Sequence, residues 1–168
     1  MNLEPAVYNN YYSGYIDKVI DKDWKVALDK ESLTMIHFIE KIPEQKSDFR
    51  YAEDKWSVKE VLLHLLDCER IMAYRALCFA RGDKTELPGF DEKQYGTRSN
   101  ASNLTLAQIN LAYQAQRRST ILMFESFSEE MMDLQGSANG VILSPRALAY
   151  IIAGHALHHR SVLKERYL

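Results

Sequence analysis

Apolar residues recur three or four positions apart along four segments of the chain. These segments are residues 23–42, 57–82, 105–127 and 144–166. On a helix, such spacing places the apolar side chains in one stripe that must be buried against other elements. Amphipathic helices of this number and length pack most economically side by side. The pattern therefore predicts an all-α fold, a four-helix bundle, with residues 1–168 as a single domain.

Polar residues at the ends of these segments support the same boundaries. Ser57 and Glu60 have the spacing of a capping box, and so have Thr105 and Gln108. Pro145 stands at the first position of the last segment, where its missing N–H would have had no helical partner. Helices are therefore expected to begin at these three points.

Three further segments lie outside the predicted helices. Residues 8–15 hold four tyrosines and form either a short extra helix packed across the bundle or an ordered coil. Residues 136–140 begin and end with Gly and predict a turn. Residues 83–103 show no helical periodicity. A segment of about twenty residues without regular structure is long for a connection in a compact domain. This connection between the second and third helices either crosses from one end of the bundle to the other or covers a site.

Composition narrows the class of protein. Seven Gly and four Pro among 168 residues disfavour strand-rich folds, which need many turns. The formal charge is −2 and long runs of one sign are absent, so no nucleic-acid-binding surface is expected. The N-terminal residues lack the pattern of a signal peptide, and no apolar run is long enough to span a membrane. We expect a cytoplasmic protein without a membrane partner.

The two cysteines are expected to stay reduced. Cys68 and Cys78 lie in one predicted helix, where ten residues correspond to about 15 Å. A disulfide requires Cα atoms within about 7 Å of each other. Both residues are therefore expected to be free thiols packed in the core, which agrees with a cytoplasmic location.

Three of the five histidines are predicted to face the interior of the bundle. His155 and His159 are four residues apart and project side by side from the last helix. His64 belongs to the apolar stripe of the second helix. Imidazoles gathered in an apolar interior need partners, and they repel one another when protonated. A divalent cation removes both problems, and three nitrogens with open positions are typical of a catalytic metal site.

Spacing alone leaves alternatives open. A buried histidine is more often hydrogen-bonded than bound to a metal, and His158 is also placed to pair with His155. Successive helical residues point about 100° apart, so His158 and His159 cannot both face one point. We take His159 as the ligand and His158 as a neighbouring or surface residue. His37 has no partner at helical spacing and is expected at the surface.

Two segments around these histidines resemble the signatures of a known family. Residues 55–70 contain the pattern W-S-x(6)-H, which resembles the second-helix signature of the DinB-like (YfiT-like) superfamily. Residues 153–160 contain G-H-x-x-x-H, which is similar to its last-helix signature. The resemblance extends over essentially the whole chain, including residues 81–83 and 87–90. The two patterns together are more specific than either one alone.

The resemblance implies a four-helix bundle with a divalent metal, nickel or zinc, held by His64, His155 and His159. Family members of known activity are thiol-dependent transferases and isomerases, and many others are described as metal-dependent hydrolases. A small-molecule substrate and a low-molecular-weight thiol cosubstrate are therefore implied, and a homodimer is left open. A superfamily implies a fold and a metal more firmly than it implies a reaction.

A general base is expected on the rim of such a site. Asp67, three residues after His64, is the candidate catalytic carboxylate. Glu60 lies four residues before His64 but already has a capping role. The chain has no Ser-His-Asp order, phosphate-binding loop or dinucleotide fingerprint. The nucleophile is therefore expected to come from water or from a cosubstrate.

Two functions from different classes follow. In the first, the chain is a metal-dependent transferase or hydrolase in which the ion activates a thiol or water towards a small molecule. In the second, it is a non-catalytic metal-binding bundle used for dimerisation or sensing. The two differ at the metal, since a catalytic site leaves coordination positions open beneath a pocket and a structural site fills them with protein ligands.

Part of the connection at residues 83–103 is hypothesised to overlie the metal and to shape substrate entry. Phe90 and Tyr95 suit contacts with a small organic substrate. The second helix continues for about 28 Å beyond His64 before the connection begins. Only the returning half, residues 95–103, is therefore expected to reach back to the histidines.

Overall fold

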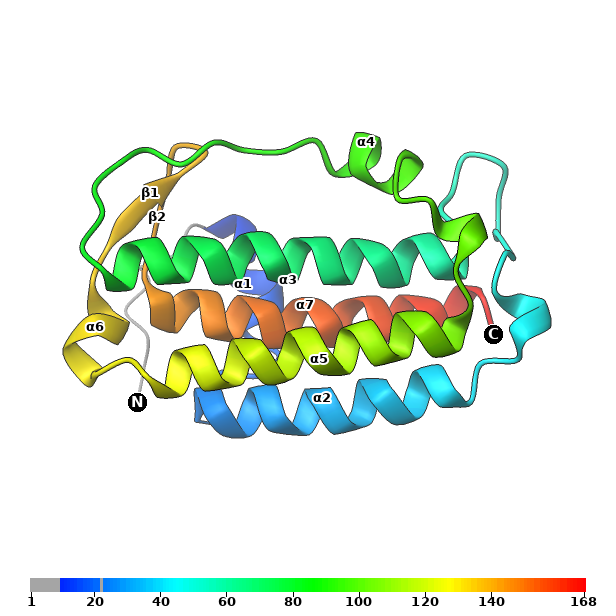
Figure 1. Cartoon of the computed structure of the whole chain (residues 1–168), viewed down its shortest axis with the longest axis horizontal. Coiled ribbons are helices and arrows are strands. Elements are labelled where there is room, and N and C mark those ends of the chain that lie inside the picture. The colour runs from blue at the N-terminus through cyan, green and yellow to red at the C-terminus, as the bar shows by residue number, and fades with distance from the viewer. Residues whose placement is uncertain (1–9, 22) are drawn as a thin grey trace.

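In the computed structural model, which describes residues 10–21 and 23–168, four long helices lie side by side (Figure 1). They are α2 (Trp24–Glu40), α3 (Val58–Ala80), α5 (Leu106–Glu125) and α7 (Pro145–Arg166). Both predicted capping boxes are present, at the starts of α3 and α5. The all-α fold predicted from the hydrophobic pattern is confirmed. No helix in the described part of the chain has both the length and the apolar character needed to cross a membrane.

The connection between α3 and α5 sets the order of the bundle. α2 and α7 run in one direction, whereas α3 and α5 run in the other (Figure 1). Because α3 and α5 are parallel, the chain between them returns along the length of the bundle, which confirms the crossover. α3 packs against both α5 and α7, and so does α2. The helices that carry His64 and His155 are therefore antiparallel neighbours.

The described part of the tyrosine-rich segment is helical. A single 3₁₀ turn (Asn10–Tyr12) leads into the short helix α1 (Ser13–Ile16), which packs against α7. This agrees with the first of the two alternatives, a short extra helix on the bundle. Tyr8 and the N-terminal residues considered for a signal peptide lie outside the described residues.

The turn predicted at residues 136–140 belongs to a small hairpin of two strands. β1 (Gly136–Ala138) pairs antiparallel with β2 (Val141–Leu143). Asn139 and Gly140 form the two-residue loop with φ of 54° and 72°, a conformation that matches the twist of a hairpin. The N–H of Leu87 donates to the oxygen of Ser137 at 3.0 Å. The hairpin therefore holds the beginning of the long connection. The short helix α6 (Glu129–Asp133) precedes it.

Two apolar clusters fill the bundle on either side of a layer of buried polar side chains. Arg117 of α5 donates from Nε and Nη2 to the two carboxylate oxygens of Glu69 in α3, each at 2.9 Å. Arg160 of α7 donates to Glu31 of α2 at 2.9 Å. His155 also belongs to this layer. The candidate site is thus built at the level where polar groups replace the apolar core.

Candidate metal centre

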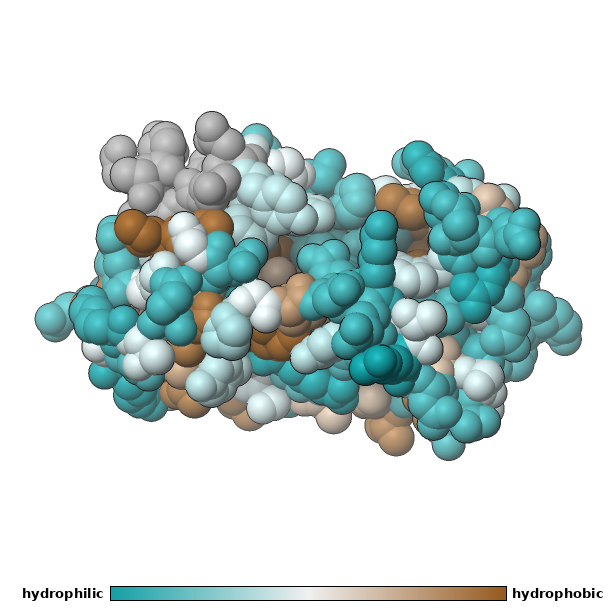
Figure 2. All heavy atoms as spheres, turned by 90° about the horizontal axis from the view of Figure 1, so that it is seen from above, coloured by the Kyte–Doolittle hydropathy of each residue, from teal (hydrophilic) through white to brown (hydrophobic). Residues whose placement is uncertain are grey.

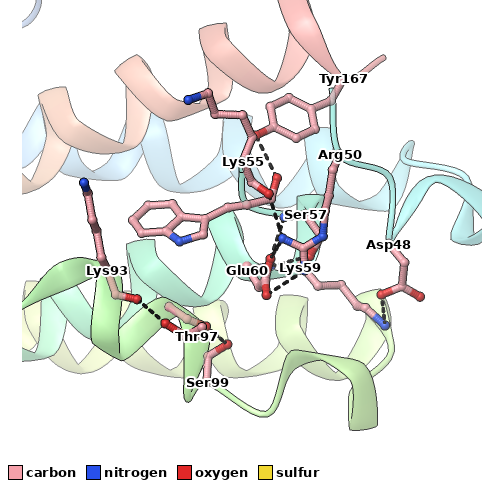
Figure 3. Close-up of polar contacts among 12 residues, drawn as sticks. Asp48, Arg50, Lys55, Ser57, Lys59, Glu60, Lys93, Thr97, Ser99 and Tyr167 are labelled. Atoms are coloured by element: carbon pink, nitrogen blue, oxygen red, sulfur yellow. Dashed lines mark hydrogen bonds and ion pairs between the residues drawn. The ribbon is translucent and has the colours of Figure 1, made fainter. Parts of the chain in front are cut away.

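Polar contacts hold the start of α3, the helix that carries His64 (Figure 3). The Ser57 hydroxyl accepts from the N–H of Glu60, and the Glu60 carboxylate accepts from the N–H of Ser57 at 2.6 Å. Tyr167, next to the end of α7, donates its hydroxyl to the backbone oxygen of Trp56 at 2.9 Å. These contacts tie the first turn of α3 to the end of α7. They hold His64 level with the last turns of α7.

His64, His155 and His159 meet between α3 and α7. The Nε2 atoms of His64 and His155 are 3.2 Å apart. One ring nitrogen from each of the three residues lies within 4.8 Å of the others. A tetrahedral zinc ion with Zn–N distances of about 2.05 Å places its nitrogen ligands about 3.3 Å apart. The three imidazoles are therefore spaced closely enough to bind a single ion.

Burial keeps these three imidazoles neutral at neutral pH. Desolvation lowers the pKa of His64 to about 4. Desolvation, together with the neighbouring imidazoles, lowers the pKa of His159 to about 3 and the pKa of His155 well below its ordinary value. The Nδ1 atom of His159 is buried and has no hydrogen-bond partner among the described residues. Neutral imidazoles with an unpartnered ring nitrogen fit a divalent cation, which requires unprotonated ligands.

His158 lies beside this group. Its ring centroid is 5.0 Å from that of His159 and 5.4 Å from that of Tyr15. The close group of ring nitrogens contains His159 and not His158. The geometry therefore favours His159 over His158 as the partner of His155. His37 is exposed on α2 beside Glu40, away from this group, as expected.

Gly154 allows α1 to approach these rings. A Cβ atom at this position would lie 2.0 Å from the backbone oxygen of Tyr15, so a larger residue cannot fit without a shift of α1. The Tyr15 ring stands edge-on to the rings of His155 and His158. The glycine that precedes His155 in the sequence motif is therefore explained by the packing of α1 on α7.

Replacing Gly154 with Ala is expected to lower the free energy of unfolding by about 1–3 kcal/mol, the usual cost of overpacking. Gly14→Ala is the matched control, because a Cβ at Gly14 meets no atom within 4 Å. Urea denaturation of the two variants compares them directly. Equal stability would mean that the contact between α1 and α7 at Tyr15 is not tight.

A cavity of about 160 Å³ opens beside the three histidines. Its other walls come from the N-terminal segment, from α3 and the residues just before it, from the long connection and from α7: Tyr11, Tyr12, Tyr15, Trp56, Cys68, Met72, Arg75, Phe90, Glu92 and His158. A second hollow of about 320 Å³ shares five of these residues and extends to the hairpin. Figure 2 looks onto the face that carries the connection, where apolar side chains show between polar ones near the middle. The cavity provides room for a small molecule next to an ion.

The connection reaches this cavity earlier than the sequence predicted. Phe90 and Glu92 line the cavity, whereas only residues 95–103 were expected to approach the histidines. The reason is the pitch of the backbone, since an extended chain advances about 3.3 Å per residue and a helix about 1.5 Å. Residues 83–92 can therefore retrace most of the length of α3 that follows His64. The expectation for the returning half alone was wrong.

The short helix α4 (Glu92–Thr97) stands over the site through Trp56. A Cβ at Gly96 would lie 2.7 Å from Nε1 of Trp56, so α4 rests directly on the indole. The Trp56 ring in turn lies 4.7 Å from the His64 ring, centroid to centroid. The end of α4 is closed by Thr97, whose hydroxyl donates to the oxygen of Lys93 (Figure 3). The connection therefore packs above the histidines as well as crossing the bundle.

The carboxylates near the site are arranged differently from the prediction. Asp67 accepts a hydrogen bond from Arg70 at 3.1 Å and lines a separate hollow under α4. A residue three positions after His64 is turned about 60° from it, away from the side of α3 that forms the cavity. The Glu60 carboxylate accepts a hydrogen bond from the N–H of Ser57 and forms an ion pair with Arg50 at 2.7 Å. Glu92 is the carboxylate that lines the cavity, and no sequence signal pointed to it.

Cys68 and Cys78 are both free, as predicted. The Cys68 sulfur lies 3.5 Å from Nδ1 of His64 and forms part of the cavity floor. Burial raises the pKa of this thiol above its ordinary value. Cys78 is only half-buried, so the expectation of a core position holds for Cys68 alone.

The chain is similar to known proteins both in sequence and in structure. Residues 27–163 match the sequence model of the DinB superfamily. The structure of YfiT from Bacillus subtilis, described as a probable metal-dependent hydrolase with an unusual four-helix bundle topology, is similar with a TM-score of 0.73. The match covers 89% of this chain and 84% of YfiT at 16% sequence identity, which shows a shared fold. No curated protein matches the chain in sequence.

Proposed function

Because the chain belongs to the DinB superfamily, we propose that it is a metal-dependent enzyme in which His64, His155 and His159 hold one divalent ion. Imidazole ligands suit zinc and nickel, and these are the ions proposed. When bound, such an ion lowers the pKa of water or of a thiol and so supplies a nucleophile near neutral pH. The observation that carries the proposal is the cavity of about 160 Å³ that the three imidazoles line.

The surrounding side chains have distinct roles in this proposal. The three histidines hold the ion and stay unprotonated because they are buried. The aromatic walls limit the access of bulk water, which strengthens electrostatic interactions in the cavity. Glu92 is exposed on the rim and is placed to accept a proton from water or a thiol that enters. Glu92 thus takes the role for which Asp67 was the sequence candidate.

Hydrolysis and thiol transfer share the same activation and differ in the nucleophile. The similarity to YfiT, described as a probable metal-dependent hydrolase, supports hydrolysis, and the resemblance to thiol-dependent family members supports transfer to a low-molecular-weight thiol. A non-catalytic metal-binding bundle for dimerisation or sensing is the second candidate. A cavity beside the histidines favours the enzyme, because a structural site would be enclosed by protein ligands.

Assays of the zinc- and nickel-loaded chain test the proposal. One assay follows hydrolysis of small esters and amides, and the other follows the loss of an electrophile in the presence of a small thiol. We expect turnover in one of the two that falls to the metal-free level in His159→Ala and persists in His37→Ala. Full metal binding without turnover in either assay would favour the non-catalytic function.

We further expect His158→Ala to keep the metal and His159→Ala to lose it. The reason is that His159 belongs to the close group of ring nitrogens and His158 does not. Elemental analysis of the two purified variants after exposure to zinc measures the difference. If His158→Ala loses the metal and His159→Ala keeps it, His158 is the ligand that pairs with His155. If both variants lose the metal equally, His158 is a residue that positions the ligands.

A further inference from the structure

Arg75 is a buried cation that faces the cavity beside the histidines. Only 4% of its surface is exposed, and it lines both the cavity and the neighbouring hollow of about 320 Å³. Its Nη2 donates to the backbone oxygen of Pro88 at 2.8 Å, and its guanidinium lies 6.0 Å from the centroid of the Phe90 ring. A guanidinium carries five N–H donors and a full charge. Glu86 interacts with Arg75 electrostatically and Glu92 lines the same cavity, but neither carboxylate forms an ion pair with Arg75.

The other buried cations in the described part of the chain have carboxylate partners. They are Lys59 with Asp48, Arg117 with Glu69, and Arg146 with Asp133 and Glu129. Burying a charge costs free energy unless the charge is paired. Arg75 forms no ion pair with a carboxylate of the described residues. Among the described residues it is therefore the buried cation without a carboxylate in direct contact, which leaves N–H donors of its guanidinium available to an anion from outside the chain.

Arg75 also lies in line with His64 along α3. Residues 64, 68, 72 and 75 follow one another at intervals of three or four, share one face of the helix and all line the cavity. Eleven residues of helix separate His64 from Arg75, which corresponds to about 16 Å of rise. Long side chains on a helix lean towards its N-terminus, here towards His64. One small molecule can therefore reach from the histidines to the guanidinium.

We propose that Arg75 binds a carboxylate of the small molecule whose reacting group lies at the three histidines. The position of the reacting group rests on the proposed function, whereas the carboxylate site rests on Arg75 and the cavity. A guanidinium donates two parallel hydrogen bonds to a carboxylate, a geometry that lysine does not provide. Glu92 on the same rim disfavours a doubly charged anion such as a phosphate ester.

The walls between the two ends indicate the rest of this ligand. Between His64 and Arg75 the floor of the cavity is formed by Cys68 and Met72, and Phe90 covers it from the connection. These side chains offer apolar contacts and few hydrogen bonds. The ligand class that fits is a small carboxylic acid with an apolar spacer of several atoms between the carboxylate and the reacting group.

Calorimetric titration with hexanoate and its neutral isostere hexanamide tests this proposal on the zinc-loaded chain and on the metal-free chain. We expect hexanoate to bind at least tenfold more tightly than hexanamide in both forms, because hydrogen bonds between charged groups are the stronger ones. Arg75→Gln is expected to abolish this preference, and Arg75→Lys to retain part of it. Glu92→Gln is expected to increase the affinity for hexanoate about two- to fivefold by removing a like charge.

Several results would overturn the proposal. A preference for hexanoate that survives in Arg75→Gln, or that appears only with zinc bound, would place the carboxylate elsewhere. Equal affinity for the two compounds in the wild type would leave Arg75 with only its structural contact to Pro88. Tighter binding of hexyl phosphate than of hexanoate would assign the site to phosphate esters. Glu92 is exposed, so its replacement does not disturb the core. The change in hexanoate affinity in Glu92→Gln therefore tests whether the ligand binds here as an anion even if Arg75→Gln fails to fold. Absence of turnover in every assay would contradict the proposed function and leave this binding result standing.

Discussion

Replacing Arg117 with Met is expected to lower the free energy of unfolding by about 3–5 kcal/mol, the usual cost of removing one partner from a buried ion pair. Arg117 is 1% exposed and donates to both carboxylate oxygens of Glu69. It also donates to the backbone oxygen of Leu28 at 3.3 Å, so one side chain joins α5 to α3 and α2. Without it, the Glu69 carboxylate remains buried and unpaired. Equilibrium unfolding in urea measures the loss.

Arg118→Met is the matched control for this prediction, because Arg118 is the next residue of α5 and is exposed. Its stability is expected to stay within about 0.5 kcal/mol of the wild type. The double variant Glu69→Leu with Arg117→Met is expected to recover much of the loss, since no charge is then left unpaired. Similar stabilities for Arg117→Met and Arg118→Met would show that the pair does not hold the polar layer together.

Replacing His155 with Ala is expected to reduce the affinity for zinc or nickel at least tenfold. His155 is buried between α3 and α7, and its Nε2 lies 3.2 Å from that of His64. Removing it leaves two imidazoles on the two helices, with one fewer nitrogen for the ion. Competition with a chromophoric chelator measures the affinity of the wild type and of the variant.

His37→Ala serves as the control for this prediction, because His37 lies on the exposed face of α2. Its metal affinity is expected to equal that of the wild type. Circular dichroism establishes that both variants remain folded, so that a loss of affinity reports on the site. If His155→Ala and the wild type bind the ion equally well, the assignment of the ligands is wrong.

The helices and the grouping of the histidines were predictable because both depend on local spacing. Ser57 and Glu60 are three residues apart, and the capping box they form marks the start of α3 whatever lies elsewhere. His155 and His159 share a helix face by their separation alone. His64 is placed opposite these two residues by its position in the apolar stripe of α3. The side-by-side packing of α3 and α7 then brings His64 to the other two.

The hairpin was missed although the sequence carries a signal for it. Asn139-Gly140 is a favoured pair for a two-residue hairpin loop, because both residues tolerate positive φ. The flanking strands are only three residues long, so they show little alternation to support the prediction. The turn was therefore recognised and its strands were not.

The rim of the cavity was predictable only in part, because the sequence pointed to Phe90 as a substrate contact but not to Glu92 or Arg75. Glu92 and Phe90 belong to a connection without periodicity, and their position depends on how far an extended backbone travels before α4 begins. Arg75 stands on the predicted face of α3, but its lack of a carboxylate partner becomes visible only when the surrounding elements are in place. Asp67 is three residues after His64, a spacing that turns its side chain about 60° from that of His64 and away from the cavity, so nearness in sequence alone is not sufficient for a place at the site.

X-ray absorption spectroscopy of the zinc-loaded wild-type chain identifies the ligands of the ion. We expect about one ion per chain, with three imidazole nitrogens among its ligands and the remaining ligand from solvent. These ligands correspond to His64, His155 and His159, with a coordination position open to the cavity. An ion bound by fewer than three imidazoles, an ion enclosed entirely by protein ligands, or no bound ion would contradict the assignment of an open three-histidine metal site.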